Sequence, residues 1–207
     1  MTRRLWGAAP PPGATSTAAV SARLGAYCWV EQQLFSILGG WVPEVPELDV
    51  KLALAEHADH AAWRAQRWYE LLPSAPPGPE ALLTAPGGLE DLAARIAAVA
   101  DGPDRTIEKL AVTYRVVLPR LAAALDAHRD WSAAVAGSSV PRLLGVAADD
   151  IATDWVAGER LLQTLVSEPK ALDRCHVAQS AIEGLVATAG GLVGAPSAGD
   201  RPLGGGS

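Results

Sequence analysis

The sequence has few of the residues that define several common classes of protein. Of its 207 residues, two are cysteines, Cys28 and Cys175. They lie far apart in the chain and neither belongs to a C-x-x-C pair, so the signatures of thiolate metal sites and disulfide scaffolds are missing. We therefore expect both thiols to be reduced and buried.

The chain also has no block of positive charge and no long uninterrupted apolar run. Lys and Arg number 17 against 23 Asp and Glu, which gives a formal net charge of −6. Because nucleic-acid binding depends on clustered positive charge, we expect no nucleic-acid partner. Polar residues interrupt every long apolar segment, and prolines at positions 10–12 break the one that follows the N-terminal arginines. The sequence thus predicts no signal peptide and no membrane-spanning helix, and we expect a cytoplasmic protein.

The two ends of the chain differ in composition from the rest. Residues 1–15 and 195–207 are rich in Pro, Ala and Gly, and such segments bury too little apolar surface to offset the entropy lost on ordering. We expect both to be disordered tails. The length that lies between them, residues 16–194, suits a single domain with a substantial core.

Between the tails, apolar residues recur at intervals of three and four, which is typical of amphipathic helices. No alternating run of β-branched residues indicates a strand. Ser and Thr caps, Gly stops and Pro positions set the expected ends of the helices. The predicted helices cover residues 16–40, 49–72, 89–100, 104–135, 138–167 and 170–190. Pro119 should kink the helix over residues 104–135, because proline removes one backbone hydrogen bond.

The lengths of the connections predict how these helices are arranged. Short links join the first two long helices and the next two, so each pair should form an antiparallel hairpin. Residues 73–103 form a connection long enough to cross over between the hairpins. The sequence therefore predicts an all-α bundle of four long helices with an extra C-terminal helix. A plain up-down-up-down bundle is the alternative.

Three of the long helices carry an ionisable residue in the middle of the apolar face that should turn inward. An unpaired charge buried there would lower the stability of the fold by several kcal/mol. Residues three or four apart are neighbours on a helix, which pairs His57 with His60, Glu56 with His60, and Asp150 with Asp154. We expect these groups to find partners in the interior of the bundle. The candidates are Glu31 on the first helix, Glu56, His57 and His60 on the second, Tyr114 on the third, and Asp150 and Asp154 on the fourth.

This set resembles the metal centre of the ferritin-like superfamily, over about residues 17–167. There, each of two hairpins supplies a lone Glu from one helix and a Glu-x-x-His pair from the next. Glu31 matches the first lone Glu, but Tyr114 stands where the second is wanted, and neither Glu-x-x-His pair is present. The resemblance implies a ferritin-like bundle of two hairpins with a crossover, and iron or manganese as the metal.

Three functional interpretations follow. In the first, the protein is a degenerate or non-catalytic member of the superfamily, and its polar residues form a structural network with donors such as Arg64, Arg115 or Tyr114. In the second, it is a dioxygen-using oxidoreductase or a metal-handling protein, with Tyr27 or Tyr114 orienting the ligands. The metal ligands would then come from Glu31, Glu56, His57, His60, Asp150 and Asp154. The third interpretation is a cavity for an apolar small molecule.

Trp63, Arg64, Arg67 and Trp68 are predicted to form a belt on the second long helix. The belt should either cover the crossover or, if exposed, meet a second subunit. In the latter case we expect a homodimer through the first two helices, because a two-fold axis buries such a patch against itself.

Overall fold

The computed structural model describes residues 17–76, 78–132 and 139–194. Every regular element in these ranges is helical and none is a strand, which confirms the all-α prediction. The two predicted tails lie outside the described residues. So do the end of the helix predicted over residues 104–135 and the turn after it.

Four long helical segments form the body of the molecule. The first two are α1 (Thr17–Trp41) and α2 (Leu48–Glu70). The third is a continuous run of α4 (Thr106–Val112), the π-helical turn η3 (Thr113–Val117) and α5 (Leu118–Ser132), and the fourth is α6 (Ser139–Leu165). The crossover contains the 3-10 turns η1 (Pro79–Leu82) and η2 (Pro103–Arg105) on either side of α3 (Leu92–Ala100). The last helix is α7 (Pro169–Thr188).

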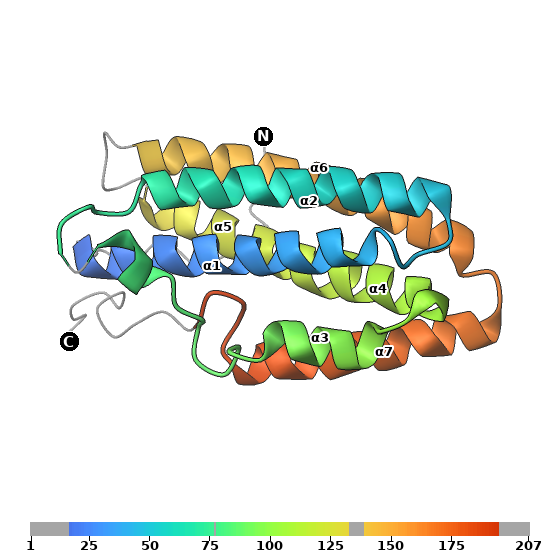
Figure 1. The fold of residues 1–207 in the computed structure, drawn as a ribbon. Helices are drawn as coiled ribbons and strands as arrows, with labels where there is room; N and C mark the ends of the chain where they lie inside the picture. Colours follow the sequence, from blue (N-terminus) through green and yellow to red (C-terminus); the bar gives the residue numbers. More distant parts are fainter. Residues whose placement is uncertain (1–16, 77, 133–138, 195–207) are drawn as a thin grey trace.

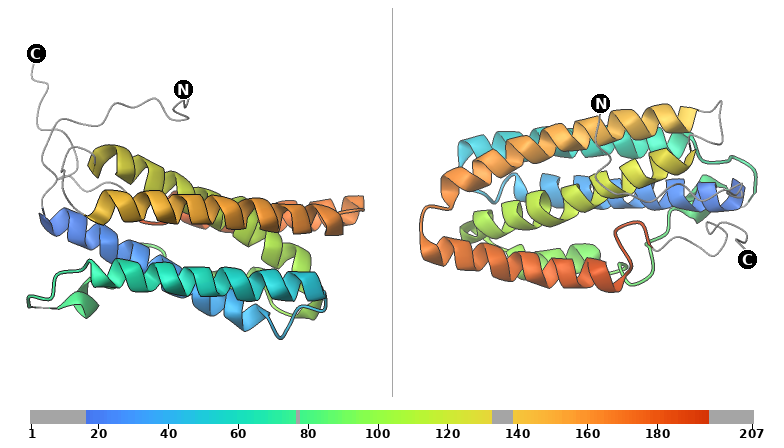
Figure 2. Two further views of the ribbon diagram at one scale, coloured as in Figure 1. Left: turned by 90° about the horizontal axis from the view of Figure 1, so that it is seen from above. Right: turned by 180° about the vertical axis from the view of Figure 1, so that it is seen from behind.

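The long segments pair as two antiparallel hairpins, α1 with α2 and α5 with α6 (Figure 1). The crossover returns along the length of the bundle, so α2 and the α4–α5 segment run in the same direction (Figures 1 and 2). The hairpins meet where α2 packs on α6 and where the Tyr27 hydroxyl of α1 donates to the carbonyl of Ala124 in α5 at 3.1 Å. Both α3 and α7 pack against α4.

The interior follows the three-and-four spacing of the sequence. On α2 the buried residues are Val50, Leu54, His57, Ala58, Ala61, Arg64, Ala65 and Trp68. On α6 the buried residues are Leu144, Ala147, Ala148, Ile151, Asp154, Gly158 and Leu162. On α7, Cys175, Ile182 and Val186 are buried, whereas Leu172 and His176 are exposed.

The predicted belt on α2 does not form. Arg64 and Trp68 are core residues, 1% and 0% exposed, because they share the inward face with His57 and Ala61. Trp63 is 45% exposed, and the guanidinium of Arg67 lies 5.8 Å from the centre of its ring. The crossover lies against α1 and α4 rather than over this surface.

Near Pro119, where a kink was predicted, the helix contains the π-helical turn η3, which ends two residues before the proline. The Leu118 N–H donates to the carbonyl of Thr113, five residues earlier, instead of the usual four. Pro119 has no N–H to continue the α-helical ladder from the preceding turn. The wider turn carries Tyr114 into the interior of the bundle.

A candidate polar centre

Six polar side chains from all four long segments meet in the middle of the bundle, and we call this group the polar centre. Its members are Glu31 from α1, His57, His60 and Arg64 from α2, Tyr114 from η3 and Asp154 from α6. Spacings of three and four place the three α2 residues on one side of that helix. Apart from His60, none of the six is more than 3% exposed.

Arg64 joins the first hairpin to the second through its guanidinium group. Its Nε donates to Glu31 Oε1 at 2.8 Å and its Nη2 donates to Glu31 Oε2 at 3.1 Å. Its Nη1 donates to Asp154 Oδ2 at 3.3 Å. The guanidinium therefore engages both carboxylate oxygens of Glu31 in the fork geometry that suits arginine, and also bridges to α6.

Asp154 is shared between Arg64 and two imidazoles. His60 Nδ1 lies 2.8 Å from Asp154 Oδ1, and because an ionised carboxylate only accepts, this imidazole nitrogen carries the hydrogen. His57 Nε2 lies 3.6 Å from the same oxygen, which is an electrostatic contact rather than a hydrogen bond. The two imidazole rings stack with centres 6.1 Å apart.

Tyr114 completes the network on the side of η3. Its hydroxyl lies 2.7 Å from His57 Nδ1, and its ring meets the imidazole edge to face at 5.5 Å. Gly158 of α6 makes room for this ring, because a β-carbon at that position would stand 2.2 Å from Tyr114 Cε1. The phenol, the imidazole and Asp154 thus form one connected chain.

Burial sets the protonation of these groups. Burial raises the pKa of Glu31, and the adjacent Arg64 works against that rise. Burial lowers the pKa of His57, against the charge of Asp154, and so favours the neutral imidazole. Burial raises the pKa of Tyr114, and the charge of Asp154 adds to the effect. The phenol therefore stays protonated, and its hydroxyl can donate a hydrogen bond to His57 Nδ1. Burial alone would lower the pKa of Arg64, but Glu31 and Asp154 outweigh it and raise the pKa.

The sequence predicted most of this group. Glu31, His57, His60, Tyr114 and Asp154 come together as expected. The other predicted residues lie elsewhere. Glu56 is exposed on α2, and Asp150 is half-buried on α6. Tyr27 contacts the rings of Trp68 and His128, whose centres lie 5.1 and 5.7 Å from its own.

The central role of Arg64 was not predicted, although the signal was in the sequence. Arg64 follows His57 by seven residues, which is two helical turns, and therefore shares its face. It was expected as one of several donors and as part of an outer belt, because arginine is rarely buried.

The side chains of the centre that could act as metal ligands do not suit the iron or manganese site that the resemblance implies. Both oxygens of Glu31 accept from Arg64, and the two oxygens of Asp154 accept from Arg64 and His60. A divalent cation would also meet the positive charge of the guanidinium. Among the described residues, no group of three or more His, Cys, Asp or Glu side chains is placed to hold a metal ion.

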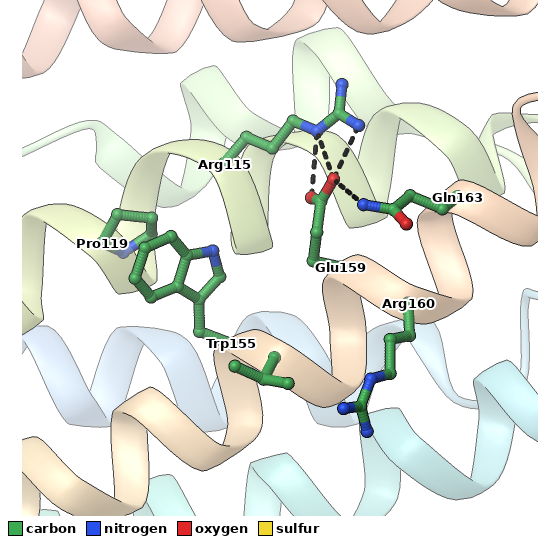
Figure 3. A pocket seen from close by; sticks show the side chains of 7 residues that line it. Arg115, Pro119, Trp155, Glu159, Arg160 and Gln163 are labelled. Carbon is green, nitrogen blue, oxygen red and sulfur yellow. Dashed lines mark hydrogen bonds and ion pairs between the residues drawn. The ribbon is translucent and has the colours of Figure 1, made fainter.

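A second feature is a hollow of about 630 Å³ on the outer side of the groove between α6 and the η3–α5 segment (Figure 3). Trp155 lies beside Pro119, and Arg160 from α6 also lines the hollow. Arg115 donates to both carboxylate oxygens of Glu159, from Nε at 3.0 Å and from Nη2 at 2.8 Å. Arg115 and Glu159 therefore neutralise one another's charge at the edge of the hollow.

None of the described helices is both long and apolar enough to cross a membrane. Compared with known proteins, the chain matches no family model, no curated protein sequence and no solved structure.

Proposed function

We propose that this protein is a non-catalytic bundle of ferritin-like topology, in which the polar centre serves structure and the outer surface serves association. The observation that carries the proposal is the guanidinium of Arg64, which lies between the carboxylates of Glu31 and Asp154. Two buried negative charges thereby meet a permanent positive charge that belongs to the chain itself.

The topology is proposed from the course of the chain. The two antiparallel hairpins and the lengthwise crossover make α1 parallel to α6 and α2 parallel to α4–α5 (Figure 1). Each long segment therefore has antiparallel neighbours, which is the arrangement expected of a ferritin-like bundle. A plain up-down-up-down bundle would not need the crossover.

The structural role of the centre follows from the cost of leaving its charges unpaired. Removing one partner of a buried ion pair costs about 3–5 kcal/mol, because the remaining charge stays desolvated. A shift of α1 or α6 by one turn along its axis would separate Glu31 or Asp154 from Arg64 and incur that cost. We propose that the centre fixes the axial register of both hairpins.

The association surface is proposed on the outer face of the α1–α2 hairpin. Phe35 is 49% exposed there and borders a hollow of about 320 Å³. The hollow is lined by Gln32, Phe35, Ala62, Ala65, Gln66 and Tyr69. An exposed aromatic side chain beside a shallow hollow suits a two-fold contact, so we propose a homodimer through this face. Light scattering should give a dimer mass for the wild type and a monomer mass for Phe35→Glu.

The test of the structural role combines elemental analysis with unfolding. Protein purified without chelator, then incubated anaerobically with ferrous iron or manganese, should retain no stoichiometric metal. Glu31→Gln and Arg64→Met should each unfold at lower denaturant concentration than wild type, while Glu70→Gln, in an exposed ion pair with Arg67, should not.

An opposite result would establish the metal-binding alternative. Stoichiometric iron or manganese in the wild type, lost in a Glu31→Ala and His60→Ala double variant that keeps its helicity, would overturn the structural proposal. Oxygen consumption would then become the next assay.

A further inference from the structure

We infer that the hollow between α6 and the η3–α5 segment binds a small aromatic anion, with its ring packed on Trp155 and its negative group paired with Arg160. None of the residues that line this hollow belongs to the polar centre. The inference therefore does not depend on the structural role proposed for that centre. It adds a ligand-binding site on the outer surface of the bundle.

The hollow has the size of a small-molecule site and rests on a fixed framework. Its volume of about 630 Å³ lies within the range of about 300–1,000 Å³ that is usual for such sites. The ion pair of Arg115 with Glu159 ties η3 to α6, and the contact of Tyr114 with Gly158 sets the spacing of these two elements. A framework that is already formed lowers the cost of binding a ligand.

Large apolar side chains are exposed at this hollow. Trp155 is 39% and Val156 is 48% exposed, and the ring of Pro119 lies beside the indole (Figure 3). Apolar side chains that gather at a surface hollow indicate a binding site, whereas scattered ones do not. An indole packs well against another flat ring in an offset stack. The apolar part of the lining therefore favours an aromatic ligand.

The charges that line the hollow favour an anion. Arg115 and Arg160 carry two positive charges, and Glu159 carries one negative charge. The carboxylate of Glu159 is already engaged, because it accepts from Arg115 at 2.8 Å and from the amide of Gln163 at 3.2 Å. In the part of the chain that the structure describes, no carboxylate pairs with Arg160. A carboxylate suits its guanidinium best, since the two groups can form two parallel hydrogen bonds.

The spacing of Trp155 and Arg160 sets the length of the ligand. They are five residues apart on α6, which corresponds to a rise of about 7.5 Å along the helix. Two fused aromatic rings that carry a carboxylate span a comparable length. Naphthoate is therefore the probe, and naphthamide, which has the same shape without the charge, is its control.

Trp63 and Arg67 on α2 provide a matched control for the protein. They are also an exposed tryptophan and an arginine on one helix, with the guanidinium 5.8 Å from the centre of the ring. Trp63 lines neither of the two hollows described above, and Arg67 is paired with Glu70 at 2.8 Å. Trp63→Ala and Arg67→Gln should therefore leave naphthoate binding unchanged.

The experiment is isothermal titration calorimetry of wild type and single variants with each probe. Wild type should bind one naphthoate per chain with a Kd on the order of 0.1 mM. Trp155→Ala should weaken this binding by about 10-fold, because the ring loses its stacking partner. Arg160→Gln should weaken naphthoate binding by about 5-fold and leave naphthamide binding unchanged.

Glu159→Gln should act in the opposite direction. It removes the negative charge that neutralises Arg115, so naphthoate should bind about 3- to 10-fold more tightly. A partly unfolded variant would not bind more tightly, so this gain separates the charge effect from a loss of structure.

The outcomes decide the inference without touching the polar centre. Weaker binding by Trp155→Ala and Arg160→Gln, together with tighter binding by Glu159→Gln, supports it. It is overturned if wild type binds no naphthoate at millimolar concentration, or if Trp155→Ala and Trp63→Ala bind it equally well. Equal affinity for naphthoate and naphthamide also overturns it, because the ligand would then need no negative charge.

A second copy of the chain is the other occupant that would cover this surface. Light scattering of Trp155→Ala distinguishes the two. A monomer mass for this variant beside a dimer mass for wild type would overturn the inference, because the hollow would then lie within the dimer interface. Equal masses for the two proteins would leave the hollow open to the ligand, as the inference requires.

Discussion

The ring of Tyr114 lies so close to the backbone of Gly158 that a β-carbon on the glycine would stand 2.2 Å from Tyr114 Cε1 and 2.3 Å from Cδ1. Such distances are far inside van der Waals contact, and Tyr114 is fully buried, so its ring has no free space to enter. The contact fixes how closely α6 approaches η3, and through Tyr114 it fixes the position of His57.

Gly158→Ala should therefore destabilise the protein by about 3 kcal/mol, as overpacking of a close-packed core does. Gly145→Ala is the matched control on the same helix, because nothing lies within 4 Å of a β-carbon there. Alanine at that position should stabilise the helix by up to about 1 kcal/mol. Urea unfolding followed by circular dichroism measures both, and equal stability of the two variants would contradict the packing described.

Tyr114→Phe should destabilise the protein by about 1–3 kcal/mol while leaving the ring in place, because His57 Nδ1 would lose its partner in a buried site. Tyr69→Phe serves as the comparison, since its hydroxyl bonds Glu80 at the surface. That variant should unfold at nearly the wild-type urea concentration. If the two tyrosine variants behaved alike, the Tyr114 hydroxyl would have no structural part in the centre.

Glu159→Gln should lower stability at neutral pH and do so less as the solution becomes acidic. Hydrogen bonds from Arg115 hold the pKa of Glu159 below its usual value, so this carboxylate stabilises the native state above the unfolded pKa of about 4.3. The contribution disappears as pH falls through the folded pKa, which lies lower. Unfolding free energies of the variant and wild type should converge between about pH 5 and pH 3. A gap that stays constant over this range would mean that Glu159 acts through packing alone.

Both cysteines should resist thiol reagents in the native state. Burial, assisted by the charge of Glu31, raises the pKa of Cys28 to about 11, and its Sγ donates to the carbonyl of Ala65 at 3.3 Å. Cys175 is also fully buried, and burial raises its pKa. Because the thiolate is the reactive species, labelling by a disulfide reagent should be about 1,000-fold slower than in urea-unfolded protein. Rapid labelling of either thiol in native buffer would contradict this placement.

The sequence predicted the helices well because their signals are local. Apolar spacing, the glycines at 39 and 40 and the prolines at 73 and 169 lie within a few residues of the ends that they predict. Glu31 and Asp154 were placed in the interior for the same reason, because each lies in the middle of the apolar face of its helix. Which helix faces which depends on contacts between residues far apart in the chain, and connection lengths supplied only part of that information.

The partner of each buried charge was harder to predict than its burial. The predictions gave Glu31 and His60 a metal ion or a hydrogen-bond donor as partner, and they placed Arg64 both among several such donors and on an outer belt. Pairing Arg64 with Glu31 requires the relative rotation of α1 and α2, which no local pattern specifies. Glu56 was misplaced for a similar reason. One residue before His57, it is turned about 100° around α2, and this is enough to carry its carboxylate to the surface.

The π-helical turn η3 also determines where the second hairpin could lose a residue. A π turn contains about one residue more than an α turn, so deleting one residue from Thr113–Val117 would let an ordinary α-helix close the gap. The helix after the deletion would then keep nearly the same orientation, and Leu121 and Leu125 would stay in the interior. The same deletion within α5, just before Leu121, would instead turn everything after it by about 100°. For this segment, the position of a deletion matters more than the number of residues that it removes.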